Sequence, residues 1–187
     1  MVIFGRLSGI RNGRSEGLPP SWQARHVFHS SRCQHTECFP GVSLMNIHIA
    51  ESDQEISDCY PVMRELRPHI EAGEFLSRVR KQEESGYRLA YVSGPDGVVA
   101  VAGFRTGENL AWGRFLYIDD LVTLPSHRSK GIGSALFTWL EGFAGSEGCP
   151  ELHLDSGFQR KGAHRFYERA GMPATGYHFA VKIRRNE

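Results

Sequence analysis

Two glycines separated by one residue, Gly131 and Gly133, lie in the stretch HRSKGIGSAL at residues 127–136. An apolar strand pattern precedes them and an apolar helical pattern follows, so we place them at the start of a helix. The first N–H groups of a helix have no partner inside it, and the helix dipole adds partial positive charge there. Because glycine lacks a Cβ atom, a phosphate can approach this backbone closely. The stretch predicts a phosphate-binding turn, although both glycines could equally serve turn geometry alone.

Two common nucleotide-binding motifs do not fit this turn. A P-loop requires Gly-Lys followed by Ser or Thr after four intervening residues, and that order is absent. A dinucleotide fingerprint requires a third glycine where this chain has Leu136, and an early βαβ unit. Arg128 and Lys130 could add positive charge to the turn or lie in solvent.

The acidic pair Asp119–Asp120, in YIDDL, is the first candidate for proton transfer. A carboxylate can take a proton from an ammonium group, directly or through water. Neighbouring side chains of a strand point to opposite faces, so at most one faces a shared cleft unless a β-bulge intervenes. A structural ion pair with an arginine, or a turn cap, would explain the same residues without catalysis. His153, Asp155 and His178 are secondary candidates on later strands.

A second stretch, AHRFYERAGM at residues 163–172, predicts a helix that stops at Gly171. Tyr167 and Phe166 share the i, i+3, i+4, i+7 spacing of one helix face with two alanines. Taken alone, this spacing favours a buried core tyrosine whose hydroxyl needs one partner.

The elements that position these residues follow from the periodicity of the chain after Met45. Strand-rich hairpins followed by two strand–helix units predict an α/β domain of the α+β kind, with a mixed sheet flanked by helices. The expected helices cover about 56–66 (capped by Ser52 or Asp53), 74–84, 131–143 and 160–170, and the expected strands 46–50, 87–94, 98–108, 110–123, 151–155 and 177–183, with turns at 95–97 and 107–109.

With the long apolar strand before it, the R-x-x-G-x-G string resembles the acetyl-CoA-binding motif of the GNAT superfamily of N-acetyltransferases, in a bacterial branch. The resemblance covers roughly Met45 to Ile183. It implies the GNAT fold, with a mixed, mostly antiparallel central sheet, and acetyl-CoA as co-substrate. By position, it assigns the acetyl and pantetheine contacts to Leu121, Val122 and Thr123, and the pyrophosphate contacts to Arg128, Ser129, Lys130, Gly131, Ile132, Gly133 and Ser134.

The resemblance also implies a mechanism, in which a neutral primary amine attacks the thioester directly in a ternary complex. Tyr167 would act as general acid toward the departing thiolate, Asp119 or Asp120 would assist deprotonation, with Asp119 preferred, and backbone N–H groups would stabilise the oxyanion. Cys149 shows no sign of an activated thiolate. The chain departs from the family in having Arg160 where members often carry Asn, which puts the cofactor contact of that side chain in doubt.

Three other functions remain open from the sequence. The acceptor could be a protein or peptide amine rather than a small molecule. The domain could bind acyl-CoA as a sensor without turnover, against which the tyrosine and the aspartates argue. A toxin that acetylates aminoacyl-tRNA would want a basic groove, and a formal net charge of +1 gives it little support.

The bulk composition bounds these alternatives. A chain of 187 residues with 40% hydrophobic side chains supports one domain with a core. Balanced charge predicts no nucleic-acid partner, and no apolar run reaches the ~18 residues of a membrane span. Four scattered cysteines show no disulfide framework, so we expect a cytoplasmic protein. An amine acceptor is the expected partner, and a homodimer stays open.

Residues 1–44 have no sustained period and read as a disordered or extra N-terminal extension ahead of an N-acetyltransferase domain at 45–187. The five arginines loosely resemble a transit peptide, but glycines and prolines break any long amphipathic helix. Arg6 interrupts the apolar stretch that a secretory signal needs. The His and Cys residues of HVFHSSRCQHTEC lack zinc-ligand spacing, so we expect no metal site.

Overall fold

The computed structural model describes residues 46–183, so the expectations for residues 1–44 lie outside the described part of the chain. A five-stranded sheet forms its centre, with the strands in sequence order. All neighbouring strands are antiparallel except the last two, which are parallel. The elements are β1 (Ile47–Ile49), α1 (Asp53–Asp58), α2 (Tyr60–Met63), α3 (Ala72–Glu83), β2 (Tyr87–Gly94), β3 (Gly97–Asn109), β4 (Gly113–Thr123), a 3₁₀ turn (Pro125–His127), α4 (Ile132–Ser146), β5 (Glu151–Leu154) and α5 (Lys161–Arg169). The expected mixed, mostly antiparallel sheet is confirmed.

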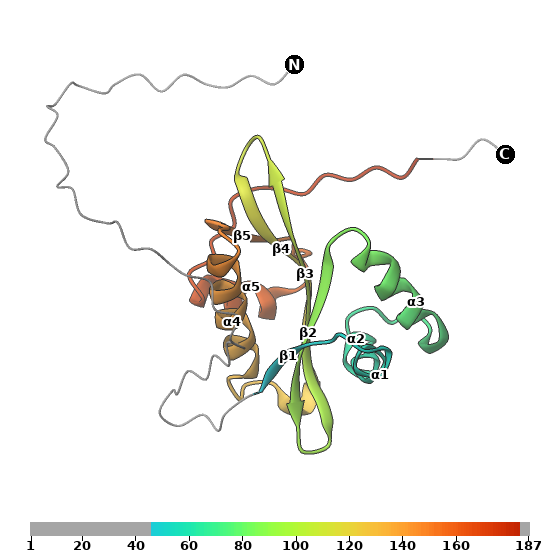
Figure 1. Ribbon diagram of the computed structural model, residues 1–187. Coiled ribbons are helices and arrows are strands. Elements are labelled where there is room, and N and C mark those ends of the chain that lie inside the picture. Colours follow the sequence, from blue (N-terminus) through green and yellow to red (C-terminus); the bar gives the residue numbers. More distant parts are fainter. Residues whose placement is uncertain (1–45, 184–187) are drawn as a thin grey trace, which may run out of the picture. The chain divides into compact units, whose positions relative to one another are not determined.

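Helices cover both faces of the sheet, with α1, α2 and α3 on one side and α4 and α5 on the other (Figure 1). Alternation along the strands decides which side chains each face receives. Leu89 and Val101 are fully buried under the first three helices. The opposite face carries small side chains such as Ala90 and Ala102, and the larger apolar side chains of α4 pack onto them.

The expected helix at 56–66 is wrong in extent, because it is broken into α1 and α2 at Cys59. Ser52 caps α1 as predicted, in a reciprocal pair with the Glu55 carboxylate. Pro61 stands in the first turn of α2, where the N–H it lacks is not needed. Leu66 lies past the end of α2 but still packs on the same core.

The expected turn at 107–109 is displaced by three residues. β3 runs on to Asn109, whose side-chain oxygen accepts hydrogen bonds from the N–H groups of Ala111 and Trp112. Gly113 then adopts a φ of 67°, which favours glycine. An Asn side chain often bonds to backbone N–H groups two or three residues later and so starts a turn, which was the sequence signal for a turn after Asn109. The expected turn at 95–97 is confirmed, with β2 ending at Gly94 and β3 beginning at Gly97.

The expected last strand is wrong, because residues 172–183 form no strand. The apolar side chains of this segment are largely exposed, at 76% for Tyr177, 89% for Phe179, 81% for Val181 and 82% for Ile183. An alternating sequence forms a strand only where another strand offers it a free edge, and within residues 46–183 none pairs with this one.

Candidate functional site

The glycine turn ends in a left-handed residue that opens α4. Gly131 is the N-cap of the helix, with φ of 80° and ψ of −8°. A Cβ atom built on Gly131 would meet no atom within 4 Å, so the backbone angle, rather than packing, calls for glycine here. Ser129 also has a positive φ, of 60°. Two positive φ angles, at Ser129 and Gly131, thus shape the turn that leads into α4.

The first N–H groups of α4 remain available to a ligand. The first bond inside the helix runs from the Ala135 N–H to the Gly131 carbonyl, and no side chain of the described chain caps the helix start. Helix geometry leaves the N–H groups of Ile132, Gly133 and Ser134 without partners inside it. These groups and the dipole of a 15-residue helix together make an anion-binding position.

Arg128 ties this turn to the end of β4. Its Nε donates a hydrogen bond to the Thr123 carbonyl over 3.2 Å, although the side chain is exposed. The 3₁₀ turn Pro125–His127 lies between the two residues. Lys130 is exposed without a salt bridge to the residues described. This hydrogen bond thus links the turn directly to the end of the strand.

β4 and β5 separate halfway along β4. Their parallel pairing runs from Phe115 opposite Glu151 to Ile118 opposite Leu154 and stops there. β4 continues to Thr123, paired only with β3. Residues 119–123 therefore present an open backbone edge beside the start of α4. This separation depends on how two distant strands diverge, so no local sequence pattern could reveal it.

The ladder between β3 and β4 decides which backbone groups face that open edge. The Leu124 N–H bonds to the Val99 carbonyl, and antiparallel pairing alternates along the strand. The main-chain N–H and C=O groups of Val122 therefore form hydrogen bonds with β3, whereas those of Leu121 and Thr123 point to the open edge. The Val122 side chain is core, as its apolar character suggested.

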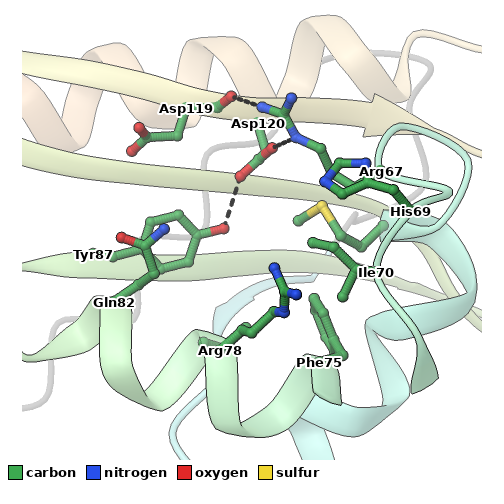
Figure 2. Close-up of a pocket in the computed structure, with 11 residues that line it drawn as sticks. Arg67, His69, Ile70, Phe75, Arg78, Gln82, Tyr87, Asp119 and Asp120 are labelled. Carbon is green, nitrogen blue, oxygen red and sulfur yellow. Dashed lines mark hydrogen bonds and ion pairs between the residues drawn. The ribbon is translucent and has the colours of Figure 1, made fainter. Parts of the chain in front are cut away.

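A β-bulge in β4 brings the two aspartates to one cleft. Gly103 pairs with Asp120 and Phe104 pairs with Ile118, which leaves Asp119 as the extra residue. From the sequence, both aspartates could face one cleft only if a β-bulge intervened, and the structure has that bulge. Strict alternation would have placed one carboxylate on each face of the sheet. Both aspartates line a cleft between α3, the loop before it and the sheet, where the Asp119 main-chain carbonyl accepts a hydrogen bond from Arg67 (Figure 2).

Each carboxylate already has a partner. Asp120 is buried, accepts from Arg67 Nε at 2.7 Å and from the Tyr87 hydroxyl at 3.0 Å. Asp119 is half-buried and accepts from Arg105 Nε at 2.8 Å. Burial, followed by the charge of Asp120, raises the pKa of Tyr87 well above its usual range, so Tyr87 remains a donor. The geometry gives Asp120 a structural ion pair and leaves Asp119 as the more accessible carboxylate.

Gly103 makes room for this cluster, which predicts a strong effect of Gly103→Ala on stability. A Cβ atom on Gly103 would overlap the Tyr87 hydroxyl and ring. We expect the substitution to lower the free energy of unfolding by about 2–3 kcal/mol, the usual cost of overpacking a core. Urea unfolding measures it. Gly142→Ala is the control, since its Cβ has open space in the middle of α4 and should stabilise by about 0.5–1 kcal/mol. Equal stability of the two variants would contradict the packing of Tyr87 against Gly103.

Tyr167 lies half-buried on α5, and its neighbour Phe166 lies close to Gly133 at the start of α4. Phe166 holds α5 against α4 through an edge contact with Phe137, with ring centroids 5.9 Å apart. The Tyr167 hydroxyl has no hydrogen-bond partner in the described part of the chain. Burial raises its pKa, and the positive charge of Arg160 opposes part of that rise. Arg160 is the N-cap residue of α5.

The secondary candidates have structural partners. Asp155 accepts a hydrogen bond from the Tyr117 hydroxyl and lies 3.0 Å from His178 Nδ1. His153 stacks on Trp112 with ring centroids 4.0 Å apart. Cys149 is buried and free. Residues 46–183 contain no group of three or more His, Cys, Asp or Glu that could hold a metal ion, and no helix there is long and apolar enough to cross a membrane.

Comparisons of the sequence identify related proteins. The acetyltransferase (GNAT) family model matches residues 49–172. The uncharacterized N-acetyltransferase YhdJ of Bacillus subtilis is 35% identical over 142 residues, which are 73% of this chain and 99% of that protein. An aminoalkylphosphonate N-acetyltransferase of Salmonella typhimurium is 34% identical over 98 residues, 52% of this chain and 62% of that protein.

Solved structures share the fold at low sequence identity. A glucosamine-6-phosphate N-acetyltransferase from Arabidopsis thaliana is 17% identical, with a TM-score of 0.62 over 76% of this chain and all of that chain. An aminoglycoside N-acetyltransferase in complex with CoA is 15% identical, with a TM-score of 0.66 over 79% of this chain and 99% of that chain.

Proposed function

The chain belongs to the GNAT acetyltransferase family, and on this premise we propose that it transfers the acetyl group of acetyl-CoA to the primary amine of a small molecule. Acyl transfer to nitrogen is the activity of the family, whereas the donor and acceptor for this chain are part of the proposal. One observation carries it: the open edge of β4 ends where the free N–H groups of α4 begin. A diphosphate and a thioester on one ligand can engage both at once.

In this proposal the α4 start binds the pyrophosphate of CoA. The N–H groups of Ile132, Gly133 and Ser134 donate to it, with Ser129, Arg128 and Lys130 on the flanking turn. The backbone of Leu121 and Thr123 aligns the pantetheine arm and the acetyl carbonyl, and Val122 contributes by fixing the strand in the sheet. Because Arg128 occupies the Thr123 carbonyl, the Thr123 N–H is the group left for the acetyl oxygen.

The reaction needs three contributions from the protein. The ammonium of the acceptor loses a proton to Asp119 directly or through water, since Asp120 is committed to Arg67 and Tyr87. The neutral nitrogen attacks the carbonyl carbon, and strand N–H groups stabilise the oxyanion. The C–S bond then breaks, the Tyr167 hydroxyl gives its proton to the leaving sulfur, and the proton lost from the acylated nitrogen restores the Tyr167 hydroxyl through water. The products are an amide and CoA.

A thiol-release assay with acetyl-CoA and a panel of amines and peptides tests the transfer. Calorimetry with acetyl-CoA separates an enzyme from a sensor, because a sensor binds tightly without releasing thiol. The cleft of about 270 Å³ beside the aspartates supports a small acceptor over a peptide. Two buried free thiols, Cys59 and Cys149, support a cytoplasmic setting.

We also propose that the protein is a homodimer, joined through residues 177–183. Within residues 46–183, the alternating apolar segment 177–183 has no strand partner, and β5 is an edge strand of the sheet. Two copies related by a twofold axis satisfy both features reciprocally, because the segment of one can add to the edge of the other. His178 holds the start of the segment near β5 through Asp155.

Phe179→Asp should weaken the dimer by about a hundredfold, because it buries a carboxylate in the apolar half of the interface. Ala180→Asp is the control, since it adds the same charge to the opposite face of the same segment. Sedimentation velocity over a range of concentrations measures both. A wild-type protein that sediments as a monomer, or a dimer that Phe179→Asp leaves intact, would contradict this assembly.

A further inference from the structure

The cleft beside Asp119 and Asp120 is lined by these two acids and by the basic side chains Arg67, His69 and Arg78. It lies between the sheet and the α2–α3 region, and measures about 270 Å³. Met63, Ile70 and Phe75 form its apolar wall. A space of this size accommodates a short molecule of a few carbon atoms rather than a drug-sized ligand. The polar groups around it therefore decide which small molecules can bind.

The acids of this cleft are largely neutralised from within the protein. Arg67 and the Tyr87 hydroxyl hold Asp120, and Arg105 holds Asp119. The cleft therefore offers a polyamine no pair of free carboxylates. A second ammonium group on a ligand would have to break an existing ion pair, which costs more than a surface contact because Asp120 is buried.

The cations of the cleft, by contrast, retain free donors. Arg78 extends from α3 toward the centre of the cleft (Figure 2). Its Nε and one terminal nitrogen pair with Glu74, over 3.1 and 2.9 Å, and both side chains are more than half exposed. Exposed pairs of this kind contribute little and exchange readily. Arg67 uses Nε and Nη2 within the protein. Each arginine thus keeps its Nη1 free among residues 46–183, and His69 lies beside Arg67 without a partner there.

We propose that the acceptor is a short amine that carries a compact oxyanion, such as a carboxylate, phosphate or phosphonate. This inference rests on the proposed acetyl transfer. The oxyanion binds Arg78, with Arg67 and His69 beside it, since guanidinium groups bind such anions through paired N–H donors. The amine then lies toward Asp119, the accessible carboxylate at the bulge. The similarity to a protein named for aminoalkylphosphonate acetylation agrees with this chemistry.

Four amines of matched length test the preference: aminoethylphosphonate, β-alanine, propylamine and diaminopropane. The thiol-release assay should give kcat/KM values at least about tenfold higher for the two anionic amines than for propylamine, with diaminopropane lowest, because one charge-assisted contact contributes roughly that factor. The ratio between the phosphonate and the carboxylate shows which oxyanion the site prefers. Equal or better turnover of propylamine or diaminopropane overturns the charge preference while leaving acetyl transfer intact.

Arg78→Gln should raise KM for the anionic amines about tenfold and leave KM for propylamine unchanged. Lys81→Gln removes a cation from the same helix outside the cleft, and should change neither value. An Arg78→Gln variant that treats all four amines as the wild type does contradicts the assigned role of Arg78.

A binding measurement separates failure of this inference from failure of the proposed function. Calorimetry of aminoethylphosphonate with the CoA-saturated protein should show binding that Arg78→Gln weakens about tenfold. Binding without any thiol release would contradict the transfer and uphold the anionic site. Absence of binding by both anionic amines overturns the site, whatever the thiol-release assay gives.

Discussion

Gly131→Asp should weaken acetyl-CoA binding by at least about a hundredfold, as measured by calorimetry. Two costs add in this variant. A residue other than glycine is strained at a φ of 80°, typically by about 1 kcal/mol. The new carboxylate also stands at the mouth of α4, where the proposal places a pyrophosphate, and like charges repel in that position.

Gly131→Asn separates these two costs. Asparagine has nearly the same shape as aspartate and tolerates the left-handed region better than most residues, but it is uncharged. We expect its affinity for acetyl-CoA to fall by no more than about tenfold. A Cβ atom meets no neighbour at this position, so both variants should fold. If Gly131→Asp bound acetyl-CoA as tightly as the wild type, the pyrophosphate would not lie at this helix.

Tyr167→Phe should lower kcat by about a hundredfold or more and leave acetyl-CoA affinity nearly unchanged, since general acids typically contribute that much. The hydroxyl is the only atom lost, and it has no hydrogen-bond partner in the described part of the chain, so the fold should not suffer. Tyr177→Phe is a matched control, because it removes a hydroxyl from an exposed tyrosine. Stopped-flow or steady-state thiol release measures kcat, and calorimetry measures binding. Equal kcat in Tyr167→Phe and the wild type would remove the general-acid role and leave Tyr167 as a core aromatic.

The pH dependence of kcat gives an independent check on Tyr167. A general acid must be protonated before it acts, and burial raises the pKa of Tyr167 above its ordinary value near 10. The active form therefore persists through neutral and moderately alkaline pH. We expect that ionisation of Tyr167 does not lower the kcat of the wild type between about pH 7 and 9. The contrary result is a loss of kcat in this range that the wild type shows and Tyr167→Phe does not. Such a loss would mean that the hydroxyl ionises too early to serve as the acid.

The helix start at Gly131 and the helix that carries Tyr167 could both be predicted from the sequence. Their signals are local: a glycine that needs a positive φ, an apolar spacing near 3.6 residues, and a glycine stop. The strands of the long hairpins were predictable for the same reason, because alternation is visible within a single segment. The helix break at Cys59 and the turn after Asn109 also have local signals, which are Pro61 and the Asn109 side chain. The spacing of apolar residues does not include these signals.

Other features depend on contacts between distant segments. The bulge at Asp119 exists because β3 and β4 pair out of register around Gly103, and it turns two residues of opposite expected orientation into one cleft. Arg67 reaches Asp120 from 53 residues away and Arg105 reaches Asp119 from 14 residues away, so their pairing has no sequence signature. Residues 177–183 carry a complete strand pattern and still form no strand.

The sequence by itself determined the residue types at the helix mouth, the order of strands and helices from β2 to α5, and the family, because each is written in short-range spacing. Only the tertiary structure decided that β4 leaves β5 at Ile118 and that Arg78 keeps a free donor inside the cleft. The physical reason is that a backbone edge, an ion pair or a strand partner is a property of two segments at once. Periodicity describes one segment, and cannot say which second segment will meet it.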